Sequence, residues 1–92
     1  MDWDKDSIFK ALGDSTRRII LDELSERNEL TLYELATQLV MKPNLAISRQ
    51  AIAKHLNTLE DAGLEISKRK GKHKVLIFNK EPLRSLLEEW LN

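Results

Sequence analysis

The most informative stretch of this chain lies between Ser48 and Leu64 and is SRQAIAKHLNTLEDAGL. Its pattern predicts an amphipathic helix, which we call the Ser48 helix. Ser48 is a good N-cap, and Gly63 suits the left-handed position just beyond a helix. The outer face of this helix carries short, polar or basic side chains. Three apolar residues recur at helical spacing and are expected to face a core: Ile52, Leu56 and Leu59.

A strongly basic segment, KRKGKHK, follows this helix from Lys68 to Lys74. Gly71 predicts a tight turn between two strands, 64–70 and 72–78, which contain β-branched and apolar residues. One explanation for lysines on a hairpin is that they merely keep an exposed strand from pairing with other chains. Five Lys or Arg in seven residues exceed that need, so we expect the hairpin to contact an anionic partner.

Three further amphipathic helices are expected before the Ser48 helix, each with its own start or stop signal. The first covers about residues 3–12, and Gly13 is its expected left-handed stop. Asp14 can cap the second helix. The third begins at Thr31, where Thr31 and Glu34 have the spacing of a capping box.

A terminal helix is expected from about Pro82, because proline suits the first turn of a helix. The chain is thus expected to be one domain, residues 1–92, mainly α with a small β-hairpin: about five helices plus a two-stranded wing. Its 92 residues, 41% of them hydrophobic and 33% charged, suit one small globular domain. It has no apolar run long enough to span a bilayer and no cysteine, and its acidic start makes a signal peptide an unexpected feature. A cytoplasmic location is therefore expected.

Charge is distributed unevenly although the formal net charge is zero. Residues 42–74 carry eight Lys or Arg and three Asp or Glu. Residues 1–41 carry five Lys or Arg and nine Asp or Glu. Residues 75–92 carry two Lys or Arg and three Asp or Glu. The positive charge therefore lies on the Ser48 helix and the hairpin, and such a local basic patch can dock on phosphates.

A helix with a basic polar face, followed by a cationic hairpin, has the outline of a winged helix-turn-helix that binds double-stranded DNA. Arginine can bind guanine through two hydrogen bonds, and glutamine can bind adenine in the same way. The side chains expected to reach base edges are Arg49, Gln50, Lys54 and Asn57. Those expected to contact the DNA backbone or minor groove are Lys42, Ser48, Lys68, Arg69, Lys70, Lys72, His73 and Lys74.

Two arginines, Arg17 and Arg18, lie near the start of the second helix, where cations oppose the helix dipole. Two compensations stay open: a salt bridge to a neighbouring acid, or a phosphate bound at that helix end. His55 is expected at the edge of the buried face, hydrogen-bonded locally. The two histidines have no evident carboxylate partner, so no metal or other cofactor is expected. The sequence also has no catalytic motif, so an enzyme is not expected.

The first and last expected helices carry many apolar side chains for so small a domain. They can cover the core of one chain, or form an interface between two copies, which we favour. A two-fold dimer would place two recognition helices one DNA turn apart, ~34–36 Å. The residues expected at this interface are Trp3, Ile8, Phe9, Leu83, Leu86, Leu87, Trp90 and Leu91.

Taken in order, these segments resemble the ArsR-type winged helix-turn-helix transcriptional repressors over nearly the whole chain. The most specific stretches are ALGDSTRRIIL from Ala11 and AKHLNTLEDAGL from Ala53. The resemblance implies a homodimer, formed by the first and last helices, that occupies a palindromic operator and blocks transcription. It also implies that the groove-contacting positions are Arg49, Gln50, Ala53 and Lys54.

The chain departs from the family pattern in two places that bear on function. Many members sense metals through cysteines in the third helix, whereas this chain has Tyr33 and Thr37 there, and its last helix offers only glutamates. Metal sensing is therefore not expected. The turn between the third and fourth helices, Val40–Ile47, is also long. The alternative function is a protein–protein interaction adaptor that uses the Leu/Trp face.

Overall fold

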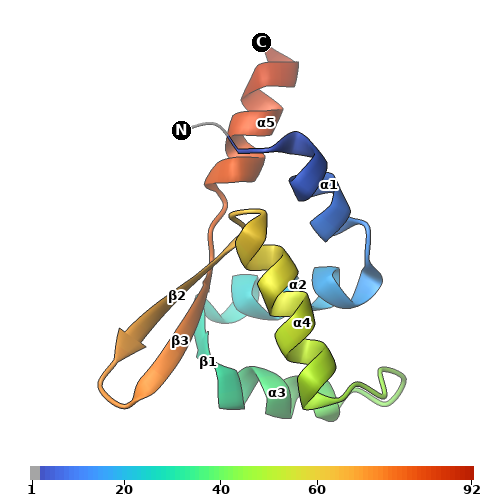
Figure 1. Cartoon of the computed structure of the whole chain (residues 1–92), viewed down its shortest axis with the longest axis vertical. Coiled ribbons are helices and arrows are strands. Elements are labelled where there is room, and N and C mark those ends of the chain that lie inside the picture. Colours follow the sequence, from blue (N-terminus) through green and yellow to red (C-terminus); the bar gives the residue numbers. More distant parts are fainter. Residues whose placement is uncertain (1–2) are drawn as a thin grey trace.

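The computed structural model describes residues 3–92 and contains five helices and three strands (Figure 1). The strands form one antiparallel sheet in the order β1-β3-β2. The elements are α1 (Lys5–Leu12), α2 (Ser15–Arg27), β1 (Glu29–Thr31), α3 (Leu32–Val40), α4 (Arg49–Asp61), β2 (Glu65–Lys70), β3 (His73–Phe78) and α5 (Glu81–Leu91). The expected winged helix-turn-helix is confirmed, with β1 as an addition to the two-stranded wing.

The predicted helix starts are confirmed by hydrogen bonds. Asp14 accepts one from the Arg17 amide at 3.1 Å, which lowers the pKa of the Asp14 carboxyl below its ordinary value. Ser48 accepts one from the Ala51 amide at 3.1 Å. The capping box of α3 is complete. The Glu34 amide donates to the Thr31 hydroxyl oxygen, and the Thr31 amide donates to the Glu34 carboxylate.

The two predicted glycine stops have different outcomes. Gly63 has φ +78° just after α4, so the left-handed position is confirmed. The prediction for Gly13 is wrong, because its φ is −74°. The Gly13 amide continues the helical pattern by donating to the Phe9 carbonyl at 2.9 Å, and the chain becomes extended only at Asp14.

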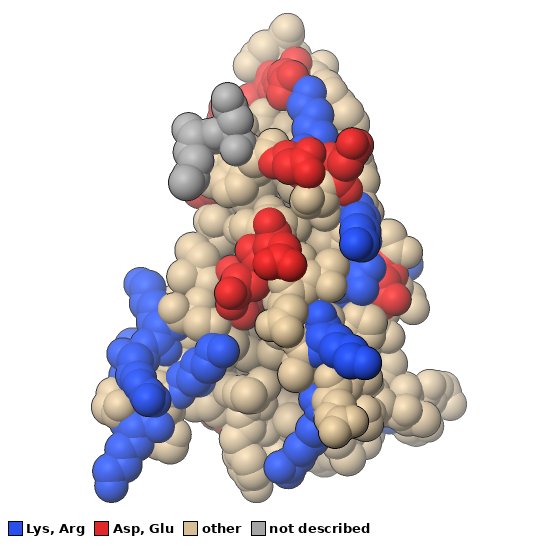
Figure 2. Space-filling model, viewed as in Figure 1, with Lys and Arg blue, Asp and Glu red and all other residues tan. Residues whose placement is uncertain are grey.

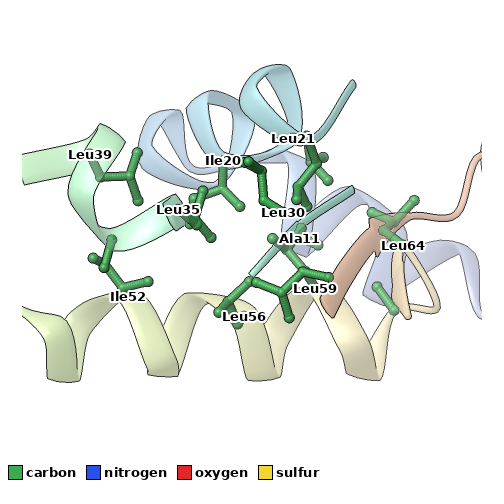
Figure 3. Close-up of a cluster of buried hydrophobic side chains, with 14 of the residues drawn as sticks. Ala11, Ile20, Leu21, Leu30, Leu35, Leu39, Ile52, Leu56, Leu59 and Leu64 are labelled. Atoms are coloured by element: carbon green, nitrogen blue, oxygen red, sulfur yellow. The ribbon is translucent and has the colours of Figure 1, made fainter. Parts of the chain in front are cut away.

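The buried face of α4 packs against the core of the molecule (Figure 3). Ile52, Leu56 and Leu59 are buried, as predicted, and point toward side chains from the helices and strand above them, including Leu35 and Leu30. This packing fixes which side of α4 faces solvent. Other buried members of the cluster include Ile20, Leu21, Leu24, Leu39, Leu64 and Leu76.

Strand β1 joins the wing to the helices. It pairs with β3, with Leu30 opposite Leu76, and both side chains are buried. Thr31 ends β1 and also caps α3. Because β3 pairs with both β1 and β2, the wing is the free end of a sheet that starts in the core.

Helices α1 and α5 lie together at one end of the molecule, whereas α3 and the wing tip lie at the other (Figure 1). The rings of Phe9 and Trp90 stack with centroids 5.7 Å apart, and Lys5 pairs with Glu89 at 2.6 Å. Within residues 3–92, no helix is long and apolar enough to cross a membrane.

Arg17 and Arg18 are compensated in a way that the sequence did not suggest. Arg17 donates to the carbonyls of Ala11 and Lys10, at 2.8 Å each, and Arg18 donates to the carbonyl of Leu12 at 2.6 Å. These carbonyls end α1, where the helix dipole favours cations. Both arginines therefore join the end of α1 to the start of α2, rather than pairing with a neighbouring acid.

His55 was expected to bond locally, and that expectation is wrong. Its Nδ1 accepts a hydrogen bond from Arg17 Nη1 at 3.1 Å, across 38 positions of sequence. The contact ties the middle of α4 to the start of α2.

Candidate nucleic-acid interface

The outer face of α4 carries side chains that are free to reach a partner. All the residues expected to read bases are exposed to solvent: Arg49, Gln50, Ala53, Lys54 and Asn57. Five ion pairs occur among residues 3–92, and none of them involves a residue of α4. Among these described residues, the cations of this face are therefore not paired with an acid.

The wing presents a second group of cations. Gly71, at φ +60°, makes the turn between β2 and β3, and the strand register places Lys70 opposite His73. Lys70 pairs with Glu29 of β1 at 2.6 Å, so its charge is already partly compensated. The other predicted wing residues are all exposed: Lys68, Arg69, Lys72, His73 and Lys74.

Basic side chains from the wing and from the lower part of α4 gather on one face of the molecule (Figure 2). Above them, toward α1 and α5, the same face carries acidic side chains together with further basic ones. Side chains alternate between the two faces of a strand, so Arg69 and Lys74 share the sheet face of Glu65 and Ser67. The lower part of this face, at the wing and the start of α4, is therefore mainly basic, whereas the upper part carries both charges.

Glu65 is a buried acidic residue that the sequence reasoning missed. It lies at the start of β2, only 3% exposed, and the Ser67 hydroxyl donates to its carboxylate at 3.1 Å. Burial raises the pKa of Glu65, and the nearby charge of Glu60 raises it further, whereas Ser67 and Lys74 oppose the shift. Nothing in its sequence context distinguishes it from a surface glutamate.

Lys42, in the turn between α3 and α4, was expected to contact a phosphate, and that contact stays a prediction. Lys42 Nζ lies 3.1 Å from the carboxylate of Glu23, a largely buried residue of α2. This ion pair partly compensates the charge of Lys42, whose side chain is still 39% exposed. Leu45 and Ile47 pack against the core, so the long turn is anchored although Ala46 has a positive φ of +40°.

The residues expected at a dimer interface fall into different environments. Ile8 and Leu86 are buried within a single chain, so they are not exposed to a second copy. Trp3 and Leu83 are partly buried against the core. The exposed members are Phe9, Leu87, Trp90 and Leu91.

One side of α5 forms a mostly apolar groove of about 550 Å³ with the end of β3. Leu83, Leu87 and Leu91 line it at intervals of one helical turn, together with Phe78. The groove lies on α5, at the end of the molecule opposite α3 and the wing tip. In the described part of the chain, no group of three or more acidic, histidine or cysteine side chains is placed to hold a metal ion.

Comparison with known proteins gives consistent matches. A family model described as a helix-turn-helix domain matches residues 12–67. An uncharacterized HTH-type transcriptional regulator, YuzN of Bacillus subtilis (strain 168), is 71% identical over 91 residues, which are 99% of each chain.

Two of the similar solved structures are described as ArsR-type regulators. The ArsR-like transcriptional regulator from Rhodococcus sp. RHA1 is 38% identical, with a TM-score of 0.78 over 92% of this chain and 72% of that one. The crystal structure of a second ArsR family transcriptional regulator is 31% identical, with a TM-score of 0.72 over 99% of this chain and 89% of that one.

Proposed function

This chain belongs to the ArsR-like family of winged helix-turn-helix transcriptional regulators, and we propose that it is a homodimeric repressor that binds a palindromic operator. The observation that carries this proposal is the shared basic face of α4 and the wing (Figure 2). The relatives are transcriptional regulators rather than enzymes. The whole chain then acts as one DNA-binding domain.

The two basic elements have different roles in this proposal. The first turns of α4 enter the major groove, where Arg49, Gln50 and Lys54 reach base edges, with Ala53 and Asn57 beside them. The wing contacts the phosphate backbone or the minor groove. Base contacts supply the sequence preference, and phosphate contacts supply affinity and orientation.

The dimer is proposed to form through α1 and α5. The exposed apolar side chains of this end, including Leu87 and Trp90, would leave solvent when two copies associate. A two-fold axis between the copies would present two α4 helices to two half-sites, ~34–36 Å apart on one side of the duplex.

Selection of bound sequences from a random DNA pool, followed by titration at two salt concentrations, tests the regulator. We expect an inverted repeat with half-site centres one helical turn apart, and an affinity that falls steeply with salt because phosphate contacts release counterions. A pool that shows no enrichment at low salt would contradict the proposal.

Repression and independence from metal need their own measurements. Purified protein should reduce transcription in vitro from a promoter that overlaps the selected operator, and an increase would contradict the repressor role. Treatment with a chelator should leave operator affinity unchanged, because the described residues offer no clustered donors for a metal.

A protein–protein adaptor is the second candidate, favoured by the apolar groove along α5. In that case the groove binds another protein, and the basic face of α4 and the wing has no role in binding DNA. The salt titration separates the two functions, since an adaptor has no reason to bind duplex DNA at low salt.

A further inference from the structure

A hollow of about 220 Å³ lies between the first turn of α3 and the first half of α4. Its walls are mostly apolar. The residues that line it are Leu32, Tyr33 and Ala36 from α3, and Arg49, Ile52 and Ala53 from α4.

The hollow opens beside residues that the proposed function places against base edges. Arg49 and Ala53 are both exposed and line it from α4. Ile52 is buried, whereas Leu32 is 39% and Tyr33 is 70% exposed, so the apolar surface extends from the core to the solvent-facing side. A base pair bound by Arg49 would therefore lie next to this hollow.

The major-groove edges of the bases differ in one apolar feature. Guanine, cytosine and adenine present hydrogen-bonding atoms there, whereas thymine also presents its C5 methyl group. Apolar protein surface favours contact with that methyl over the polar edge of another base. The chemistry of the hollow thus selects one of the four bases.

We propose that this hollow receives the C5 methyl of a thymine next to the guanine that Arg49 binds. The inference rests on the proposed function, because it requires α4 to enter the major groove. Arg49, Ala53 and Leu32 all line the hollow. In the proposed complex the guanidinium of Arg49 binds guanine, and its aliphatic stem is left to contact the thymine methyl. Each operator half-site then contains adjacent thymine and guanine, recognised by joined apolar and polar contacts.

Replacing single thymines by uracil tests this contact, because uracil pairs in the same way and lacks only the methyl. The protein is the full chain, and the duplexes carry its selected operator with one thymine changed at a time. Loss of a buried methyl should weaken binding about three- to five-fold at one thymine that neighbours a guanine. Equal binding of uracil and thymine at every position would overturn the inference.

Leu32→Ala locates the effect in the hollow, since it removes part of the wall from a half-exposed position. The variant should bind the thymine and uracil duplexes equally. Val40→Ala is the matched control, because Val40 is 63% exposed at the other end of α3 and should keep the full preference for thymine. A thymine preference that persists in Leu32→Ala would overturn the assignment to this hollow.

The experiment also separates this inference from the function on which it rests. A chain that selects an operator but does not distinguish uracil from thymine is a DNA-binding regulator without the methyl contact. A chain that selects no sequence contradicts both proposals together.

Discussion

Individual side chains divide the proposed interface into base contacts and backbone contacts. Gln50 is exposed on the first turn of α4, where an amide can bind adenine through two hydrogen bonds. We predict that Gln50→Ala lowers affinity for the operator by ~1–3 kcal/mol, and only when the contacted base pair is the preferred one. Titration against operators changed at one position checks this, and a uniform loss across all sequences would contradict it.

Glu65 should make the stability of the protein depend on pH. Burial raises the pKa of Glu65 in the folded state above its ordinary value, so the folded protein holds the carboxyl proton more tightly than the unfolded chain does. The free energy of unfolding therefore falls as pH rises from the ordinary carboxyl range through the raised pKa. Glu65→Gln removes that charge, and it should raise the free energy of unfolding at neutral pH.

Urea unfolding of Glu65→Gln at pH 7.5 and pH 4 measures this effect. The gain in the free energy of unfolding should be smaller at the acidic pH, where Glu65 is largely protonated in both the folded and the unfolded protein. The exposed Glu26→Gln is a matched control on α2 and should change little. An equal gain in the free energy of unfolding at both pH values would show that burial of the Glu65 charge does not cause the gain.

At the scale of elements, the wing is expected to add affinity without sequence preference. Lys72 lies at the tip of the hairpin, exposed and outside every ion pair found among residues 3–92, whereas Lys70 is held by Glu29. Lys72→Ala should weaken binding to all sequences alike and reduce the slope of log affinity against log salt by about one unit. The loss from Lys70→Ala should be smaller, because its charge is already compensated.

The start of α3 depends on one capping side chain. Thr31 bonds the Glu34 amide at 3.1 Å, so Thr31→Ala should destabilise the fold by ~1 kcal/mol. In a domain of this size that lowers the melting temperature by ~4–8 °C. Thermal unfolding followed by circular dichroism measures it. Thr37→Ala, on an exposed later turn of the same helix, should have a smaller effect.

Element by element, the sequence predicted what depends on near neighbours and missed what depends on distant ones. The Thr31 capping box and the buried face of α4 follow from residues three or four positions apart, and both are confirmed. Strand β1 was missed because three residues are too few to show a period. The Lys42–Glu23 pair and the burial of Glu65 depend on how separate segments fold together.

At the scale of the whole molecule, the proposed dimer joins the α1/α5 end of one chain to that of another. Leu87 is 52% exposed in the apolar groove of α5, so Leu87→Glu should place a charge in the interface and dissociate the dimer. Sedimentation measures the mass of the particle, and operator affinity should fall with it. Val40 is also apolar and exposed but lies on α3, so Val40→Glu should leave the mass unchanged.

Both tryptophans of the chain lie at the α1/α5 end: Trp3 borders Gly63, and Trp90 stacks on Phe9. The α3 and wing end holds Tyr33 and no tryptophan. Intrinsic emission excited at the red edge of indole absorption is therefore a label-free optical probe of one end of the molecule. Any change in that signal when DNA is added at the other end would measure how far the disturbance travels through the protein.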